Sequence, residues 1–238
     1  KMTAILFPGQ GSQYVGMSED FYNNFYNSKL VFEEVEDSTS INVKKIIFED
    51  SLNQLNLTNY TQLCVFTASY SIFRVIETEF DLKKMNVNTM LGHSLGEYSA
   101  LASSNKITLS DCAKLLKLRG DLMHRAVKPN ESGMAALIGL DCFSVQNIID
   151  EENLDIQTAN DNSPIQVVVS GMIHNINKSR DIFLKRGVKK FVKLNVSAAF
   201  HSNLMLEAQN IMKKYIDETI FFDSDISIIS NFSSKISN

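Results

Sequence analysis

The feature that most constrains the fold is a G-x-S-x-G pattern, "GHSLG" at residues 92–96. The preceding "MLG" predicts the end of a short buried strand, and the following "EYSALASS" predicts the start of a helix. So tight a strand–helix turn strains the serine backbone, and only small flanking residues fit beside it. This geometry would raise the Ser94 hydroxyl above the sheet, near a helix N-terminus that favours negative charge. The segment alone is equally consistent with a turn capped by a serine.

Strands and helices alternate along the first half of the chain, which is typical of a parallel sheet covered by helices. "TAILF" at residues 3–7 predicts a buried strand, and residues 18–36 and 61–79 have the apolar spacing of helices. A further helix is expected from Ser110, which suits the N-cap position. We therefore expect an α/β fold with a parallel-sheet core.

Residues 128–196 follow a different order of elements. Strand and helix patterns there alternate as β-α-β-β-α-β, with the turn-like "NDNSP" at residues 160–164 between the two middle strands. This order is that of a ferredoxin-like unit. We expect a small domain of residues 128–196 inserted into a core formed by residues 1–127 and 197–238, with "ISIISN" as a late core strand.

Composition excludes several classes of function. The chain of 238 residues has a net charge of −4 with scattered charges, so no basic stripe predicts nucleic-acid binding. No apolar run approaches the ~18 residues of a membrane span. The cysteines, Cys64, Cys112 and Cys142, are far apart and show no CxxC spacing. We expect free thiols in a reducing compartment and no metal site.

A serine nucleophile that attacks a carbonyl needs two N–H donors for the resulting oxyanion. The N–H of Leu95, directly after the serine, is the natural first donor. The second would come from the Gly-rich loop "PGQGSQ" at residues 8–13, with Gln10 between its glycines. The alternatives are a simple turn or a phosphate loop, and the latter is disfavoured because no GK[ST] follows.

The nucleophile also needs a base, and histidine is the usual one. The candidates are His93, His124, His174 and His201. His201 follows the insert in the small-residue segment "SAAFHSNLM", late in the chain as in hydrolase-type sheets. The spacing leaves open whether His201 is the base, and no Asp or Glu stands out as its orienting partner.

Arg119 interrupts an otherwise apolar stretch of a predicted helix, "KLLKLRGDLM". Its planar guanidinium could hold a substrate carboxylate through two hydrogen bonds. A salt bridge at the helix end is the equally simple alternative.

Taken together, the motifs resemble those of malonyl-CoA:acyl-carrier-protein transacylases and of the related acyltransferase domains of polyketide and fatty-acid synthases. The segments that carry the resemblance are "LFPGQGSQYVGM", "TQLCVFTAS", "GHSLGEYSAL", "LRGDLMHRA", "NDNSPIQVVVSG" and "AAFHSNLM". They occur in the family's order over nearly the whole chain. The resemblance implies a hydrolase-like α/β core with a ferredoxin-like insert.

The resemblance also implies roles for individual residues. Ser94 would carry the acyl group, His201 would be its base, and Arg119 would hold the malonyl carboxylate. The N–H groups of Gln10 and Leu95 would form the oxyanion hole. The remaining positions that match family residues lining the site are Gln62, Asn160 and Asn162, and Phe200 matches a position associated with malonyl over methylmalonyl groups.

The implied reaction transfers malonyl from malonyl-CoA to the phosphopantetheine thiol of acyl carrier protein, supplying fatty acid biosynthesis. No cofactor is implied beyond the coenzyme A thioester that serves as substrate. We expect a monomer in the cytoplasm of a bacterium, or alternatively in a plastid after removal of a leader. Ala199 and Asn203 depart from the family's "PFHSPLM". Family members continue past the "ISN" strand, so we expect the residue that orients His201 in such a continuation.

Overall fold

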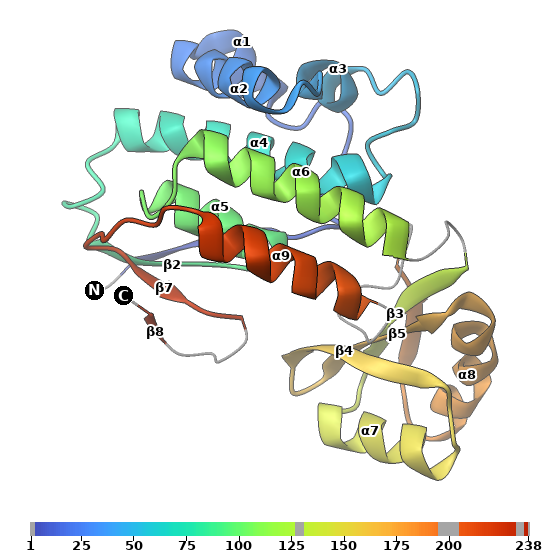
Figure 1. Ribbon diagram of the computed structural model, residues 1–238. Coiled ribbons are helices and arrows are strands. Elements are labelled where there is room, and N and C mark those ends of the chain that lie inside the picture. The colour runs from blue at the N-terminus through green and yellow to red at the C-terminus, as the bar shows by residue number, and fades with distance from the viewer. Residues whose placement is uncertain (1–2, 127–130, 195–204, 232–235, 238) are drawn as a thin grey trace. The chain divides into compact units, whose positions relative to one another are not determined.

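The computed structural model describes residues 3–126, 131–194, 205–231 and 236–237. The chain forms two compact units, one of residues Lys1–Gly120 with Met212–Asn238 and the other of Asp121–Ile211 (Figure 1). The predicted small-domain boundaries, residues 128 and 196, both lie inside the second unit, which extends further at each end.

A mainly parallel sheet forms the centre of the first unit. Its order is β1-β2-β7-β8, formed by β1 (Thr3–Phe7), β2 (Val87–Gly92), β7 (Ser227–Ile229) and β8 (Ile236–Ser237). β2 pairs in parallel with both β1 and β7, and β8 is antiparallel to β7. Because parallel strands end at the same edge, the residues that follow β1, β2 and β7 emerge side by side. The predicted parallel-sheet core is confirmed.

Helices cover this sheet in layers. α5 (Leu95–Ser103) packs on β1, β2 and α4 (Thr58–Glu79), and its Ala100 is buried with Phe7, Phe73 and Met90. Figure 1 shows an outer helical layer on α4, formed by α1 (Glu19–Asn24), α2 (Tyr26–Thr39) and α3 (Val43–Phe48). α6 (Leu109–Ala126) and α9 (Leu206–Glu218) each cross the boundary between the two units.

The helical spacing of residues 18–36 corresponds to two helices, because the chain breaks between α1 and α2. Phe25 has extended backbone angles, φ −129° and ψ 123°, and ends the first helix. The break lets the Tyr22 ring pack edge-on against Phe32 and Phe48, with ring centroids 5.1 and 5.3 Å away. Aromatic packing between helices therefore overrides the local helical spacing.

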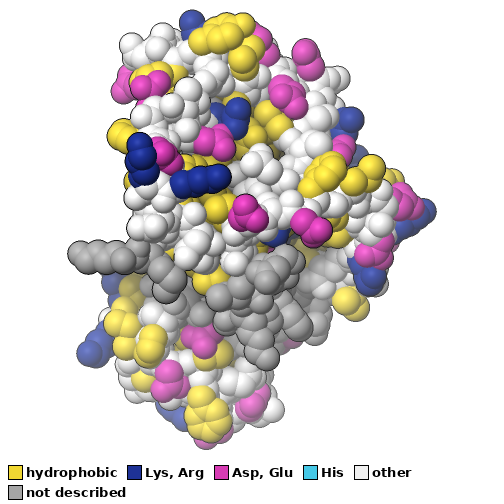
Figure 2. All heavy atoms as spheres, turned by 90° about the vertical axis from the view of Figure 1, so that its left-hand side faces the viewer, with side chains coloured by type: hydrophobic (Ala, Val, Ile, Leu, Met, Phe, Trp, Pro, Cys, Tyr) yellow, Lys and Arg dark blue, Asp and Glu magenta, His cyan; other side chains and the backbone are white. Residues whose placement is uncertain are grey.

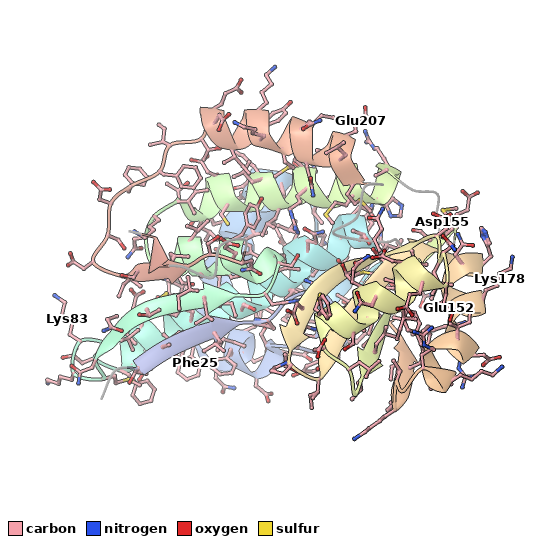
Figure 3. The ribbon with its side chains drawn as sticks, turned by 90° about the horizontal axis from the view of Figure 1, so that it is seen from below. Phe25, Lys83, Glu152, Asp155, Lys178 and Glu207 are labelled. Atoms are coloured by element: carbon pink, nitrogen blue, oxygen red, sulfur yellow. The ribbon has the colours of Figure 1, made fainter. Side chains whose placement is uncertain are left out.

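The second unit contains an antiparallel sheet with the order β4-β5-β3-β6. Its elements, in chain order, are β3 (Ser132–Ile138), α7 (Cys142–Glu151), β4 (Ile156–Ser163), β5 (Gln166–Met172), α8 (Ile173–Lys185) and β6 (Lys190–Lys193). Alternate strand residues such as Leu137 and Val169 share one core with Ile148 of α7 and Phe183 of α8, so both helices cover the same face. Arg186 joins the helix ends by donating to Glu151 and Glu152, the latter labelled in Figure 3.

The predicted turn at residues 160–164 is wrong in part. β4 continues to Ser163 and stays paired with β5 through two register irregularities, after Thr158 and after Asp161. Asn160 lies opposite Val168 within this ladder, and Asn162 falls in the second irregularity. Bulges let a strand carry residues that do not follow the regular alternation, so the polar run does not end the strand.

Within the described ranges, no helix has the length and apolar character needed to cross a membrane. The same ranges contain no cluster of three or more potential metal ligands. On the face drawn in Figure 2, acidic and basic side chains are interspersed and do not gather by sign.

Candidate active site

Ser94 occupies the turn between β2 and α5 in a strained backbone conformation. Its φ is 55° and its ψ is −112°, a combination that residues with a side chain rarely adopt. Such strain costs on the order of 1–3 kcal/mol and persists only where surrounding contacts enforce it. The side chain is partly exposed at the N-terminus of α5, as the G-x-S-x-G pattern predicts.

The glycines on either side of Ser94 are required by close backbone packing. A Cβ on Gly96 would lie 2.4 Å from the Phe7 carbonyl oxygen, and a Cβ on Gly92 would lie 1.9 Å from the Gly96 carbonyl oxygen. Gly9 also allows a close approach, since its Cβ would lie 2.6 Å from the His93 carbonyl oxygen. The loop after β1 and the nucleophile turn therefore pack backbone against backbone.

The Ser94 side chain does not cap α5. Ser94 stands at the N-cap position, yet its side chain makes no capping hydrogen bond. Its Oγ accepts a hydrogen bond from Nη2 of Arg119 at 3.2 Å. The alternative of a turn with a capping serine is thus disfavoured, because the hydroxyl faces a cation from another helix.

Arg119 projects from α6 and is held by three neighbours. Nη1 donates to Oε1 of Gln62 at 2.6 Å, Nη2 donates to Ser94, and the guanidinium carbon lies 5.5 Å from the centre of the Tyr98 ring. Burial lowers the pKa of Arg119, while Tyr98 and Glu97 oppose that shift. The guanidinium of arginine stays protonated in proteins, so Arg119 is a cation near neutral pH. The helix thus presents a positive charge beside the nucleophile.

The Gly-rich loop after β1 lies beside this turn. Gln10 is partly buried, and its Nε2 donates to Oγ1 of Thr58 at 3.4 Å, at the start of α4. Ser12 Oγ donates to the Gly9 carbonyl at 2.7 Å, which closes the loop. Leu95 is the first residue of α5, so its N–H has no acceptor within its own helix. Both predicted oxyanion donors belong to segments that meet at the Ser94 turn.

Asn231, two residues after the end of β7, is a site residue that the sequence did not indicate. Its Oδ1 accepts from the Ser94 N–H at 2.9 Å, and its Nδ2 donates to the Gly92 carbonyl. Its own N–H donates to Oε2 of Glu97 at 3.3 Å. The available signal was its place at the end of a predicted strand of the same parallel sheet as β2.

Several predicted site residues are not brought to Ser94 by the described structure. His201 and Phe200 lie outside the described residues. Asn160 and Asn162 belong to the second unit, partly buried and exposed respectively, so their role stays a prediction. His93 is exposed beside Ser94, whereas His124 and His174 belong to the second unit.

A strained serine at a strand–helix turn, beside a fixed cation and helix N–H donors, defines a site for acyl-group chemistry. The family model described as "Acyl transferase domain" matches residues 5–236, and the chain belongs to this acyltransferase family.

More particularly, the chain is similar to malonyl CoA-acyl carrier protein transacylases. That of Bacillus subtilis is 33% identical over 236 residues, which cover 98% of this chain and 73% of the relative. The crystal structure of acyl-carrier-protein-S-malonyltransferase from Bartonella henselae is 39% identical with a TM-score of 0.91, covering 99% of this chain and 76% of that one. A malonyl-transacylase solved in complex with a type II polyketide acyl-carrier protein is 31% identical with a TM-score of 0.91, covering 100% and 76%.

Proposed function

We propose that this acyltransferase moves malonyl groups from malonyl-CoA to the phosphopantetheine thiol of acyl carrier protein through an ester on Ser94. The single observation that carries the proposal is the Arg119 guanidinium, whose Nη2 lies 3.2 Å from Ser94 Oγ. A hydrolytic serine needs a base and oxyanion donors but has no use for a fixed cation there. A malonyl group differs from an acetyl group by one free carboxylate, which such a cation would hold.

The reaction proceeds in two half-reactions. In the first, a base removes the Ser94 proton as Oγ attacks the thioester carbonyl, and the C–S bond breaks to release coenzyme A as a thiol. In the second, the carrier thiol attacks the serine ester, and Oγ recovers its proton. We assign the base to His201 from the family resemblance. The N–H groups of Leu95 and Gln10 stabilise each tetrahedral oxyanion, where one donor is worth on the order of 100- to 1,000-fold in rate.

Binding of the malonyl carboxylate replaces the hydrogen bond between Arg119 and Ser94. In the structure, Nη1 is bonded to Gln62 and Nη2 to Ser94. A carboxylate that takes the place of the Ser94 hydroxyl on Nη2 would free that hydroxyl for its base. Arg119 would thereby anchor the acyl group and keep the ester turned toward the carrier thiol, which favours transfer over hydrolysis.

We propose a hydrolase-like core and a ferredoxin-like insert for the two units. The order β4-β5-β3-β6 with helices on one face supports the ferredoxin-like assignment, and the parallel β1-β2-β7 arrangement with a nucleophile turn after β2 supports the hydrolase-like one. Asn160 and Asn162 belong to the insert, and their role in binding substrate stays a prediction from the family resemblance.

The mechanism needs no cofactor besides the coenzyme A thioester, and it draws each proton from protein side chains or the substrate thiol. Malonyl-CoA and acyl carrier protein are the two proposed partners, and the product would supply fatty acid biosynthesis. A monomer and a bacterial cytoplasmic or plastid location stay predictions.

The test is intact-protein mass spectrometry of the full-length protein after incubation with malonyl-CoA, followed by holo acyl carrier protein. We expect one malonyl adduct that Ser94→Ala abolishes, and its disappearance with concurrent malonylation of the carrier. Release of free malonate without carrier malonylation would point to a hydrolase. Binding of the carrier without any adduct on Ser94 would point to a non-catalytic carrier-binding protein.

A further inference from the structure

We infer that Asn231 is a positioning residue that holds the Ser94 backbone in its reactive conformation and keeps the Ser94 N–H out of the oxyanion hole. The inference rests on the proposed function, since it concerns how the same serine is acylated. It is carried by three hydrogen bonds that connect Asn231, in the segment after β7, to both sides of the nucleophile.

The amide of Asn231 bridges the two peptide groups that flank His93. Its Nδ2 donates to the Gly92 carbonyl, and its Oδ1 accepts from the Ser94 N–H at 2.9 Å. A carbonyl and an N–H separated by one residue can bond each other directly only in a tight γ-turn. By standing between them, one side chain fixes the backbone on the N-terminal side of Ser94.

These hydrogen bonds stabilise the strained backbone of the turn. Ser94 has φ 55° and ψ −112°, and a non-glycine residue keeps such angles only where its surroundings enforce them. Its N–H stands at the N-cap position, so the helix offers it no acceptor. Asn231 supplies that acceptor from the segment that follows β7, and its own N–H donates to Glu97 in the first turn of α5 at 3.3 Å.

The hydrogen bond from the Ser94 N–H to Asn231 also indicates which backbone N–H groups can serve the oxyanion. Because the Ser94 N–H points to Asn231 Oδ1, it is already used and is not available to the developing oxyanion. Leu95, the next residue, lies at the first position of α5, where N–H groups have no helical acceptor. Asn231 therefore separates two adjacent N–H groups, one that holds the turn and one that serves the reaction.

Exposure distinguishes this role from that of a core residue. Asn231 is exposed, so its hydrogen bonds compete with water and add little to global stability. Its removal would let the strained turn relax, and a small displacement of the attacking oxygen can reduce the rate on the order of 100-fold. The expected signature is a large loss of kcat with only a small change in melting temperature.

The experiment compares full-length wild type with Asn231→Ala and Asn231→Asp. Asn88→Ala is the matched control, because Asn88 is an exposed asparagine at the start of β2. Rapid-quench mass spectrometry gives kcat and KM for Ser94 acylation by malonyl-CoA, and a fluorophosphonate probe reports Ser94 reactivity without any malonyl group. We expect Asn231→Ala to lower kcat and the probe rate on the order of 100-fold with KM nearly unchanged. The melting temperature should fall by no more than about 4 °C.

The two Asn231 variants distinguish the hydrogen bond that Asn231 accepts from Ser94 from the one that it donates to Gly92. Asp keeps an acceptor for the Ser94 N–H but, once ionised, offers no donor to the Gly92 carbonyl. Asn231→Asp should therefore retain more of the probe rate than Asn231→Ala. Equal probe rates for wild type and Asn231→Ala, or a rate loss that only follows the fraction unfolded, would overturn the positioning role. If wild type reacts with the probe but not with malonyl-CoA, the proposed function fails, and the probe rates of the variants still decide the role of Asn231.

Discussion

Gln62 accepts a 2.6 Å hydrogen bond from the Arg119 guanidinium, and its side chain is only 1% exposed. The two residues come from different helices, α4 and α6, so the bond fixes the direction of the arginine fork within the unit. A cation at the site recognises a carboxylate with directional bonds only if its plane is held before the substrate arrives. Gln62 thus acts on the substrate carboxylate through Arg119.

Replacement of Gln62 by leucine should raise KM for malonyl-CoA. The substitution keeps similar volume and removes the acceptor, so the guanidinium loses its fixed orientation. Loss of a hydrogen bond to a charged group is worth about 1.5–3 kcal/mol, which corresponds to an increase on the order of 10- to 100-fold. Steady-state rates of malonyl transfer to acyl carrier protein, at several malonyl-CoA concentrations, measure this KM. Gln146→Leu on α7 is the control and should leave KM unchanged, whereas an unchanged KM in Gln62→Leu would remove the orienting role.

Replacement of Arg119 should change which acyl group is loaded. Arg119→Ala removes both donors to a substrate carboxylate, and we expect malonyl loading of Ser94 to fall on the order of 100-fold while acetyl loading falls much less. Arg119→Lys keeps the charge but not the planar fork, so it should restore only part of the malonyl rate. Competition between malonyl-CoA and acetyl-CoA, read by intact mass, gives the ratio directly. The same ratio in wild type and Arg119→Ala would contradict the carboxylate-binding role.

Gly96→Ala should severely destabilise the first unit. The added Cβ would lie 2.4 Å from the Phe7 carbonyl oxygen and 2.8 Å from that of Pro8, and neither backbone atom can move without disturbing β1. Overpacking against a fixed backbone typically costs about 1–3 kcal/mol or more. Gly11→Ala is the comparison, since it has no atom within 4 Å of an added Cβ but a φ of +107°. It should cost only about 1–2 kcal/mol. Chemical denaturation compares the two, and equal losses would argue against the backbone clash.

The core of the fold could be predicted from sequence because its signals are local. The run "TAILF" and the strand before "GHSLG" are short, apolar and bounded by glycine turns, and they form β1 and β2. The break at Phe25 could not be predicted, because it depends on Tyr22 meeting Phe48, a residue far along the chain. The extension of β4 through residues 160–163 likewise depends on pairing with β5.

The candidate site divides in the same way. Ser94 and its glycines could be predicted because the strained turn is specified by five consecutive residues. The contact between Arg119 and Ser94 was not, since spacing along α6 does not say which residue a guanidinium meets across a helix interface. Asn231 was missed because an asparagine after a strand carries no motif, and its role appears only when β7 is placed beside β2.

The cysteines should differ in reactivity. Cys64 and Cys112 are fully buried, and desolvation raises the pKa of each thiol far above neutral pH, so little thiolate exists to react. Cys142 is partly exposed, and its pKa is raised by desolvation and by Asp161 and Asp141. Iodoacetamide at pH 8 should modify Cys142 slowly and spare the other two until the protein is denatured. Peptide mass spectrometry reads each site, and early labelling of Cys64 would contradict the buried assignment.

Glu97 should make stability depend on pH in the opposite sense to a typical carboxylate. Desolvation raises its pKa, and this exceeds the lowering by hydrogen bonds from Asn231 and by the charge of Arg119. The folded state therefore binds the Glu97 proton more tightly than the unfolded state does. The resulting contribution of Glu97 to the free energy of unfolding is fully present below the unfolded pKa of 4.5 and is lost as the pH rises through the folded pKa. Desolvation of Glu97 therefore lowers the free energy of unfolding once the pH exceeds the unfolded value of 4.5.

Glu97→Gln tests this by removing the charge while keeping an oxygen that accepts from the Asn231 N–H. The variant should have a higher free energy of unfolding than wild type near pH 7, and the difference should shrink toward zero as pH falls below 4.5, where wild-type Glu97 is protonated in both states. Chemical denaturation at several pH values measures the difference. A constant difference across that range would show that the carboxyl does not titrate differently on folding. A variant less stable than wild type at pH 7 would show that the attraction between Glu97 and Arg119 outweighs desolvation.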